Sequence, residues 1–288
     1  MILIADSGST KTQWVVIQDS VNPIISTQGI NPYQQTQAQI EDILNEELMP
    51  VLNALDEREV EEVHFYGAGC TKEKAPIVAE ALKMVVAPRA KIRVESDMLG
   101  AARSVCGNES GIVSILGTGS NACYYDGKEM IPGNPALGFI LGDEGGGAYI
   151  GKRLVGDVLK HQLPEDICKA FFEETKLTQA DIIQKVYRET LPNRFLASVS
   201  PFCARHLDNP AIHDFILDCF DQFFRRNINA YKTLETTKDK NTDVVHFVGS
   251  IAHYYRDVLT EAALHNGYKV GKIVKEPIEG LKEYHSRA

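Results

Sequence analysis

The sequence has no long apolar run: none approaches the ~18–20 residues that a helix needs to cross a membrane. No basic segment with a cleavage site precedes the apolar residues that start at Ile2, so we expect no secretion signal. Positive charge is also scarce, with 30 lysines and arginines against 39 aspartates and glutamates. That balance disfavours a nucleic-acid-binding surface, and we expect neither a membrane nor a nucleic acid as a partner.

The motifs of metal and disulfide chemistry are missing as well. The six cysteines include no C-x-x-C pair, and the eight histidines form no H-x-H or H-E-x-x-H motif, so we expect no zinc site. Six scattered cysteines in 288 residues are not a disulfide framework, and they fit best as reduced, buried thiols of a cytoplasmic protein. The 44% apolar content suffices for one large domain or two of ordinary size.

The first distinctive feature that is present is a loop of small and hydroxylated residues between two apolar runs, residues 2–5 and 14–17. The loop contains Asp6, Ser7, Gly8, Ser9, Thr10 and Lys11. Small residues let backbone N–H groups approach a polyanion closely, while hydroxyls and the lysine add donors and charge. A P-loop would continue as a helix. Here the chain continues as a strand, so the pattern indicates a phosphate-binding hairpin or an ordinary hairpin turn.

A second loop of the same kind follows about one domain length later. The apolar run 111–116 leads into Gly117, Thr118, Gly119 and Ser120, and the run 122–125 follows. Two strand–loop–strand units suggest two similar halves, each offering a loop to one nucleotide polyphosphate. The repetition favours phosphate binding over turn chemistry.

Three polar positions have a structural and a functional interpretation. Asp97 ends the predicted strand 91–97 where a helix starts, so it is either an N-cap or a residue placed for catalysis at the carboxyl end of a strand. Asn31 precedes a proline and is either a turn residue or a ligand to a substrate. Asp6 is either a turn-starting aspartate or a metal-binding acid.

A glycine-rich segment, 135–148, carries Asp143 and Glu144 near the predicted start of a helix that runs towards Leu159. Capping of the helix dipole is one interpretation of the two acids. The density of glycine favours backbone pressed against a ligand or a hinge instead. Further on, the buried strand 243–248 turns through Gly249 and Ser250 into a helix over 253–265, which by itself is an ordinary βα turn.

The order of predicted elements organises these motifs. Three strands, a helix opened by a capping box at Thr36, a strand, a helix and a strand fill the first hundred residues. Pro50 should kink or split the first helix. Residues 164–234 are predicted to be helical, and the aromatic residues of the helix opened by Asn209 and Pro210 are expected in a core. The boundary between the halves should fall near residues 108–111.

The paired loops, with Gly-Asp-Glu-Gly at 142–145 and Gly-Ser at 249–250, resemble the actin/hexokinase/heat-shock-chaperone superfamily. Within it, the chain is similar to the N-acetylglucosamine kinase branch of the BadF/BadG/BcrA/BcrD-type ATPases, over motifs scattered from Asp6 to Gly280. The resemblance implies an α/β fold of two ribonuclease-H-like domains, residues 1–108 and 109–288, around a nucleotide cleft. It further implies ATP and Mg²⁺ as cofactors and phosphorylation of an amino sugar, such as N-acetylglucosamine, at its 6-hydroxyl. Whether the protein forms a homodimer is left open by the resemblance.

The same resemblance implies roles for single residues. Asp97 would be the base for the sugar hydroxyl, Asn31 and Asp143 would bind the sugar, and Ala136 and Gly138 would line its site. Asp6 would hold Mg²⁺ through water. The residues that would bind the nucleotide are Ser7, Gly8, Ser9, Thr10 and Lys11 in the first loop, Gly117, Thr118, Gly119 and Ser120 in the second, and Gly249, Ser250 and Tyr254 at the adenosine.

One departure and two alternatives remain open at the sequence level. The better-known kinases have Gly-Trp-Gly-His where this chain has Ala136-Leu137-Gly138-Phe139, so the resemblance does not fix the sugar or its N-acyl group. The first alternative is an ATPase activator of an iron–sulfur dehydratase, for which Cys70, Cys106 and Cys123 are available. The second is a regulatory module that binds ATP and sugar without transfer.

Overall fold

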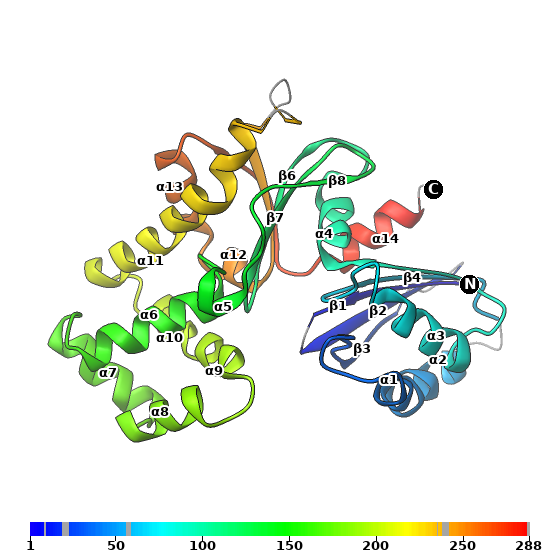
Figure 1. Ribbon diagram of the computed structural model, residues 1–288, viewed down its shortest axis with the longest axis horizontal. Helices are drawn as coiled ribbons and strands as arrows, with labels where there is room; N and C mark the ends of the chain where they lie inside the picture. Colours follow the sequence, from blue (N-terminus) through cyan, green and yellow to red (C-terminus); the bar gives the residue numbers. More distant parts are fainter. Residues whose placement is uncertain (9, 19–22, 56–58, 235, 238–241, 287–288) are drawn as a thin grey trace. The chain divides into compact units, whose positions relative to one another are not determined.

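The computed structural model describes residues 1–8, 10–18, 23–55, 59–234, 236–237 and 242–286 (Figure 1). The chain forms two compact units: Met1–Glu109 together with Glu276–Ala288, and Ser110–Lys275. Each unit is built on its own five-stranded mixed sheet. The expected α/β fold of two ribonuclease-H-like domains is confirmed, and the first boundary falls within one residue of the predicted position.

The sheet of the first unit has the strand order β3-β2-β1-β4-β5. Its elements are β1 (Ile2–Ser7), β2 (Lys11–Ile17), β3 (Ile24–Gln28), α1 (Gln37–Ile43), α2 (Met49–Leu55), β4 (Glu62–Gly67), α3 (Ala75–Val85), β5 (Lys91–Ser96), α4 (Asp97–Cys106) and α14 (Ile278–Ser286). β1 pairs antiparallel with β2 and parallel with β4, and β4 pairs parallel with β5. The predicted order of three strands, helix, strand and helix is therefore confirmed.

Helices cover both faces of this sheet. In Figure 1, α1, α2 and α3 lie on one face, and α4 and α14 lie on the other. The first face holds the apolar core, in which Trp14 and Phe65 are fully buried with their rings 5.7 Å apart. The central strands are buried on both sides: β1 starts with the apolar run 2–5, and every residue of β4 after Glu62 is buried, His64 included.

The start of helix α1 is determined by hydrogen bonds between residues close in sequence. The Thr36 side chain accepts the N–H of Gln39, and the Gln39 side chain accepts the N–H of Thr36, so the predicted capping box is present. A π-helical turn, η1 (Leu44–Leu48), separates α1 from α2 just before Pro50. The expected split of this helix is confirmed, because the proline ring and missing N–H disturb the preceding turn.

The second unit repeats the plan with the strand order β10-β9-β6-β7-β8. Its strands are β6 (Gly111–Leu116), β7 (Ser120–Tyr125), β8 (Met130–Pro132), β9 (Val244–Val248) and β10 (Lys269–Val274). β6 pairs antiparallel with β7 and parallel with β9, as β1 does with β2 and β4. The second glycine loop thus occupies the same place in its sheet as the first.

The helices of this unit include the long predicted helical stretch. They are α5 (Gly138–Leu141), α6 (Gly147–Leu159), α7 (Glu165–Thr175), α8 (Gln179–Tyr187), α9 (Pro192–Val199), α10 (Pro201–Arg205), α11 (Pro210–Phe223), η2 (Phe224–Ile228), η3 (Asn229–Lys232), α12 (Ser250–Tyr254) and α13 (Arg256–His265). Phe220, Phe223 and Phe224 are fully buried, so the aromatic stripe belongs to the core as expected. Within the described part of the chain, no helix is both long and apolar enough to cross a membrane.

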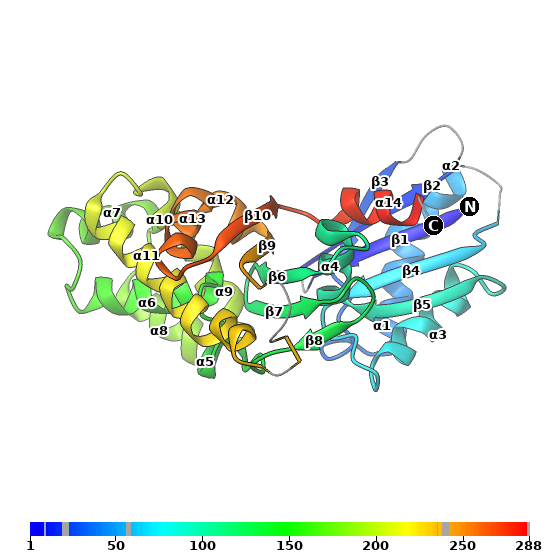
Figure 2. The same ribbon diagram turned by 90° about the horizontal axis from the view of Figure 1, so that it is seen from above.

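The last helix, α14, was not predicted, and it belongs to the first unit although the sequence placed residues 109–288 in one domain. It packs against α4 so closely that a Cβ on Gly280 would lie 2.3 Å from the Ser104 carbonyl oxygen. Figure 2 shows the chain running from β10 into α14 beside β1 and α4. This packing is long-range in sequence, so no local pattern near the C-terminus announces it.

A cluster of rings and charges fixes α14 to the sheet. The imidazoles of His64 on β4 and His285 on α14 stack with centroids 4.0 Å apart. The Tyr66 hydroxyl lies 2.9 Å from His285 Nε2 and accepts a 2.8 Å hydrogen bond from Arg103 of α4. His64 Nε2 lies 3.1 Å from Glu62. The cluster therefore joins β4, α4 and α14 through neutral rings that lie beside the positive charge of Arg103.

This cluster should make the first unit sensitive to acid. Burial lowers the pKa of His64, and burial together with His64, Arg103 and Arg93 lowers the pKa of His285 to about 3. The unfolded chain protonates both imidazoles near pH 6.5, so it takes up more protons than the folded protein as the pH falls. We expect a loss of about 1–2 kcal/mol between pH 7 and pH 5, after allowance for the partial exposure of His285.

Urea unfolding followed by fluorescence measures this loss, because Trp14 is the single tryptophan and lies in the core of the first unit. His285→Gln should reduce the pH dependence by roughly half, since one of two titrating rings is gone. An equal pH dependence in the wild type and the variant would contradict this account of the cluster.

Candidate active site

The parallel strands of the first unit bring their carboxyl ends to one edge. Ser7, Gly67 and Ser96 are neighbours across β1, β4 and β5 in register. Asp6 and Asp97 therefore lie at the same edge, next to the loop that follows Gly67. Ligands of α/β folds bind beyond this edge, so the sheet gathers the predicted catalytic and metal-binding acids in the expected place.

Asp97 is not the cap of its helix. Ser96 is the N-cap residue, and its hydroxyl accepts the N–H of Leu99, while Asp97 Oδ1 accepts the N–H of Met98 at 2.9 Å. Burial raises the pKa of the Asp97 carboxyl, and the hydrogen bonds from backbone N–H groups oppose the rise. A carboxylate with a raised pKa is a better proton acceptor near neutral pH. The N-cap interpretation of Asp97 is therefore wrong, and its role as a base stays a prediction.

Asp6 lies in an electrostatically negative place. Burial, followed by the charges of Asp97 and Glu276, raises the pKa of Asp6 to about 7, and the Lys11 charge opposes the rise. Carboxylate oxygens are the ligands that Mg²⁺ prefers, usually one or two of them together with phosphate oxygens and water. The donors at this edge therefore fit a hard divalent cation.

The first loop is a closed hairpin. The N–H of Gly8 donates to the Lys11 carbonyl at 3.0 Å, and the Ser7 hydroxyl lies 2.7 Å from the Thr12 hydroxyl. Ser7 is fully buried and also accepts the N–H of Ile30 at 3.0 Å, so its side chain shapes the loop from inside. Thr10 is exposed at the turn. Ser9, a predicted phosphate-binding residue, lies outside the described residues.

Asn31 lies at the same edge as the loop and the acids. Its Oδ1 accepts the N–H of Tyr33 at 3.0 Å, and its own N–H donates to the Gln35 side chain at 2.8 Å. The residue is 8% exposed and is pressed against Gly69, where a Cβ would lie 2.4 Å from Asn31 Oδ1. Gly69, with φ of +77°, belongs to the small-residue turn 67–70 that the sequence predicts beside a ligand, and its lack of a side chain leaves room for the Asn31 amide.

The second loop is held by the helix that follows it. The first N–H groups of α6, from Gly147 and Ala148, donate to the carbonyls of Gly117 and Thr118 at 2.8 Å. Gly249 (φ of +122°) lies against the same loop, because a Cβ there would be 2.3 Å from the Leu116 carbonyl oxygen. The turn at Gly249 and the second loop are therefore in contact within one unit.

Asp143 faces this loop in a strained conformation. Its φ of +58° is left-handed, which is uncommon for a residue other than glycine and marks strain of the kind found at functional sites. Burial raises the pKa of its carboxyl, and the hydrogen bond from the Ser120 N–H opposes the rise. The α6 N-cap is Gly146, so Asp143 does not cap the helix. The role of Asp143 as a sugar ligand stays a prediction.

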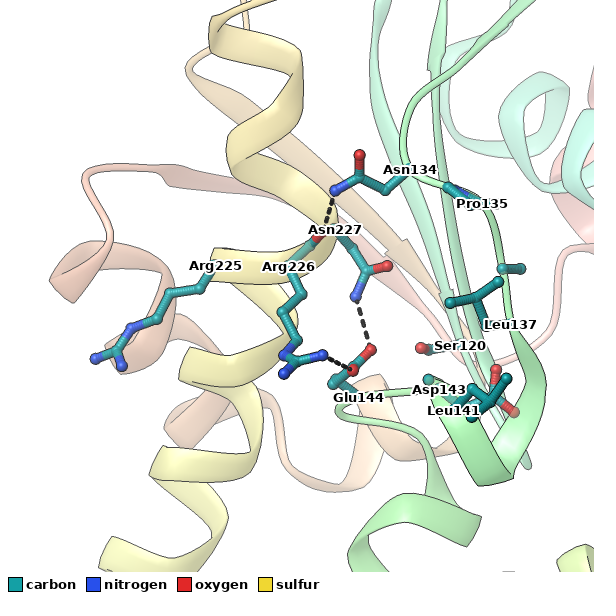
Figure 3. Close-up of a pocket in the computed structure, with 12 residues that line it drawn as sticks. Ser120, Asn134, Pro135, Leu137, Leu141, Asp143, Glu144, Arg225, Arg226 and Asn227 are labelled. Carbon is teal, nitrogen blue, oxygen red and sulfur yellow. Dashed lines mark hydrogen bonds and ion pairs between the residues drawn. The ribbon is translucent and has the colours of Figure 1, made fainter.

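A pocket of about 320 Å³ opens beside Asp143 (Figure 3). Its walls are Ser120, the segment Asn134–Leu137, the segment Leu141–Glu144, and Arg225, Arg226 and Asn227 of the α11–η2 region. Glu144 is 7% exposed and accepts hydrogen bonds from Arg226 at 3.2 Å and Asn227 at 3.3 Å. Figure 3 shows these two side chains reaching Glu144 while Arg225 points away.

Arg226 and Asn227 were missed by the sequence analysis, which assigned this helix to the core. They lie in the π-helical turn η2, and such turns are frequent at functional sites. The three polar residues 225–227 between buried Phe224 and Ile228 are a signal in the sequence, but a weak one. Their partner Glu144 lies 82 and 83 positions earlier in the chain, so only the fold reveals the contact.

The remaining predicted residues have less direct support. Ala136 lines the pocket, whereas Gly138, with φ of +73°, starts the short helix α5. The Tyr254 hydroxyl accepts a hydrogen bond from Lys275 at 2.9 Å, and its ring is 58% exposed at the end of α12. Ser250 begins α12 directly after Gly249.

The cysteines give no support to the iron–sulfur alternative. All six are buried and free. Burial, together with the nearby Asp97, raises the pKa of the Cys70 thiol to about 12. A thiolate is the form that binds iron, so these surroundings oppose cluster binding at Cys70.

Comparison with known proteins places the chain by structure. No model of a protein family matches the sequence, and a search of curated proteins finds no match either. Among solved structures, a candidate N-acetylglucosamine kinase from Porphyromonas gingivalis is similar with a TM-score of 0.92 and 45% identity, over 100% of this chain and 99% of that one. This similarity is close enough to show the family.

Two more distant structures show the breadth of the fold. A candidate N-acetylglucosamine kinase from Chromobacterium violaceum has a TM-score of 0.72 at 15% identity, with 98% of each chain covered. A ROK family glucokinase from Streptomyces griseus, solved with glucose and AMPPNP, has a TM-score of 0.52 at 11% identity, with 99% of each chain covered.

The fold and these similarities define the class as sugar kinases with the actin-like ATPase fold. The chain belongs to the N-acetylglucosamine kinase branch of the BadF/BadG/BcrA/BcrD-type ATPase family. The resemblance drawn from the paired loops and the Gly-Asp-Glu-Gly segment is confirmed. The dehydratase-activator alternative is not favoured, because the structures compared are sugar kinases.

Proposed function

We propose that this protein transfers the γ-phosphoryl group of ATP to the 6-hydroxyl of an amino sugar, with N-acetylglucosamine as the preferred substrate. The observation that carries the proposal is the meeting of Asp97, Asn31 and the first loop at one sheet edge, in a member of an N-acetylglucosamine kinase family. In the second unit, Asp143 and the pocket beside the second loop support it.

The reaction follows from these groups. The sugar oxygen attacks the γ-phosphorus, its O–H proton passes to the Asp97 carboxylate, and the bond between the γ-phosphorus and the bridging oxygen of ADP breaks. Asn31, Asp143 and Ala136 are the residues that we assign to the sugar. The two loops, with Thr10 and Thr118 as hydroxyl donors, are assigned to the phosphates, and Gly249, Ser250 and Tyr254 to the nucleoside.

Magnesium would neutralise charge on the phosphates during transfer, and Asp6 is the residue assigned to hold it through water. The described residues contain no group of three or more Asp, Glu, His or Cys side chains placed to bind a metal by themselves. The phosphates of the nucleotide would therefore have to complete the set of ligands.

A coupled assay of ADP release tests the proposal. Glucosamine, N-acetylglucosamine, N-acetylmuramic acid, N-acetylmannosamine and glucose are each offered with ATP and Mg²⁺, and the phosphorylated sugar is identified by mass spectrometry. We expect the highest kcat/KM with N-acetylglucosamine. ATP hydrolysis that is independent of sugar, or binding of both ligands without a phosphorylated product, would contradict the proposal.

The contact between Gly69 and Asn31 gives a sharper prediction. Gly69→Ala should raise the KM for the sugar about tenfold, because the new Cβ displaces the Asn31 amide and removes a hydrogen bond of ordinary strength. Gly267→Ala is the matched control: its φ of +77° equals that of Gly69, yet the nearest atom to its Cβ would be Lys232 Nζ at 3.6 Å, an ordinary contact. Equal KM values for the sugar in the two variants would contradict the role given to Asn31.

A further inference from the structure

Glu276 contacts the first loop from a distant part of the chain. It lies between β10 and α14, where the chain returns to the first unit. Its Oε1 lies 3.2 Å from Lys11 Nζ, and its Oε2 accepts a 2.9 Å hydrogen bond from Gln13 Nε2. Gln13 is 8% exposed and anchors the carboxylate, whereas the Lys11 and Glu276 side chains are 46% and 44% exposed and open to a ligand.

The contact places a negative charge beside a proposed phosphate ligand. A phosphate oxygen bound to Lys11 would lie within about 6 Å of the Glu276 carboxylate, given ordinary hydrogen-bond lengths. Asp6 and Asp97 add negative charge at the same edge, and the pKa of Asp6 responds to both Asp97 and Glu276. The charge of Lys11 is thus accompanied at this edge by the carboxylates of Glu276, Asp6 and Asp97, and their excess of negative charge repels an uncomplexed polyphosphate.

We propose that Glu276 is a selectivity residue of the first loop, which makes the loop prefer a magnesium-complexed nucleotide over the metal-free one. The inference rests on the proposed nucleotide binding and extends it to a residue that neither the motifs nor the family resemblance singled out. A divalent cation lowers the negative charge of the phosphates and is itself attracted by the carboxylates. The metal-free nucleotide keeps its full negative charge and carries no cation for the carboxylates to attract, so the carboxylates repel it.

Isothermal titration calorimetry with ADP tests this without any sugar or turnover. The affinity is measured at one ionic strength with Mg²⁺ and then with EDTA in its place. Glu276→Gln keeps the hydrogen bond to Gln13 and removes only the charge. We expect the variant to bind metal-free ADP about threefold to tenfold more tightly than the wild type, with binding of Mg·ADP unchanged or weaker.

Glu279→Gln is the matched control, because it removes the same charge from α14 at a side chain that is 63% exposed and pairs with Lys282. Its preference for Mg·ADP should equal that of the wild type. Glu276→Ala, which also removes the hydrogen bond, should lose the preference to the same degree as Glu276→Gln. An unchanged preference, or an equal loss of both affinities in Glu276→Gln, overturns the inference.

The test separates this inference from the proposed function. If the wild type binds no ADP under either condition, the nucleotide site itself is wrong and the inference is lost with it. If the wild type binds ADP and phosphorylates a sugar while Glu276→Gln keeps the wild-type preference, only the role of Glu276 is wrong.

Discussion

Asp97→Asn is expected to lower kcat for sugar phosphorylation by about 10²–10⁴-fold, the range typical for loss of a general base. The amide is close in shape to the carboxylate, and its oxygen can still accept the N–H of Met98, so the fold of the α4 N-terminus should be kept. The amide N–H groups at the other position can still donate to the oxygen of the sugar hydroxyl, but the side chain cannot take up the proton. The affinity for the sugar, measured by calorimetry, should therefore change little.

Glu95→Gln provides the control for this variant. Glu95 lies on β5 two residues before Asp97, is exposed, and loses the same charge on substitution. Its kcat should match that of the wild type. Near wild-type turnover in Asp97→Asn would show that another group accepts the proton, and the mechanism proposed above would then be wrong.

Gly119→Ala is expected to reduce kcat/KM for the sugar by about 10- to 100-fold. The new Cβ would lie 2.6 Å from Asp143 Oδ2 and 3.0 Å from its Cγ. Asp143 cannot move away cheaply, because its left-handed backbone and the Ser120 N–H hold it in place. Loss of hydrogen bonds from a charged carboxylate typically costs about 1.5–3 kcal/mol, which corresponds to the expected range.

Gly117→Ala is a control in the same loop that distinguishes an effect on sugar binding from an effect on nucleotide binding. A Cβ at Gly117 would meet nothing within 4 Å, so Asp143 should stay in place and the KM for the sugar should be kept. Any effect of that variant should fall on the KM for ATP. If Gly119→Ala leaves the KM for the sugar unchanged, Asp143 is not the sugar ligand that we assign.

Local patterns in the sequence predicted the secondary structure well. The capping box at Thr36, the strands of the first sheet, the strands β6, β7 and β9 of the second, and the start of α11 at Pro210 depend on neighbours a few residues apart, and they are confirmed. The edge that gathers Asp6 and Asp97 also followed, because parallel strands expose their carboxyl ends together. Helix α14 escaped prediction, because its stability comes from packing on α4 rather than from its own sequence.

The capping interpretations show where local reasoning fails. Asp97 and Asp143 both lie near the start of a helix, and a cap was the plain alternative for each. Ser96 and Gly146 are the actual caps, one residue and three residues away. A shift of one position decides whether a carboxylate caps the helix N-terminus or lies at the sheet edge. A sequence pattern alone does not locate the ends of helices and strands that finely.

The sequence by itself determined that two strand–loop–strand units exist, that both loops are suited to phosphate, and that an acid follows the strand at 97. Each of these depends on residues adjacent in the chain. Only the tertiary structure decided that Gly69 fixes Asn31, that Glu144 pairs with Arg226, and that Glu276 reaches Lys11. Those contacts join residues 38, 82 and 265 positions apart, and only the folding of the sheets and helices brings such residues together.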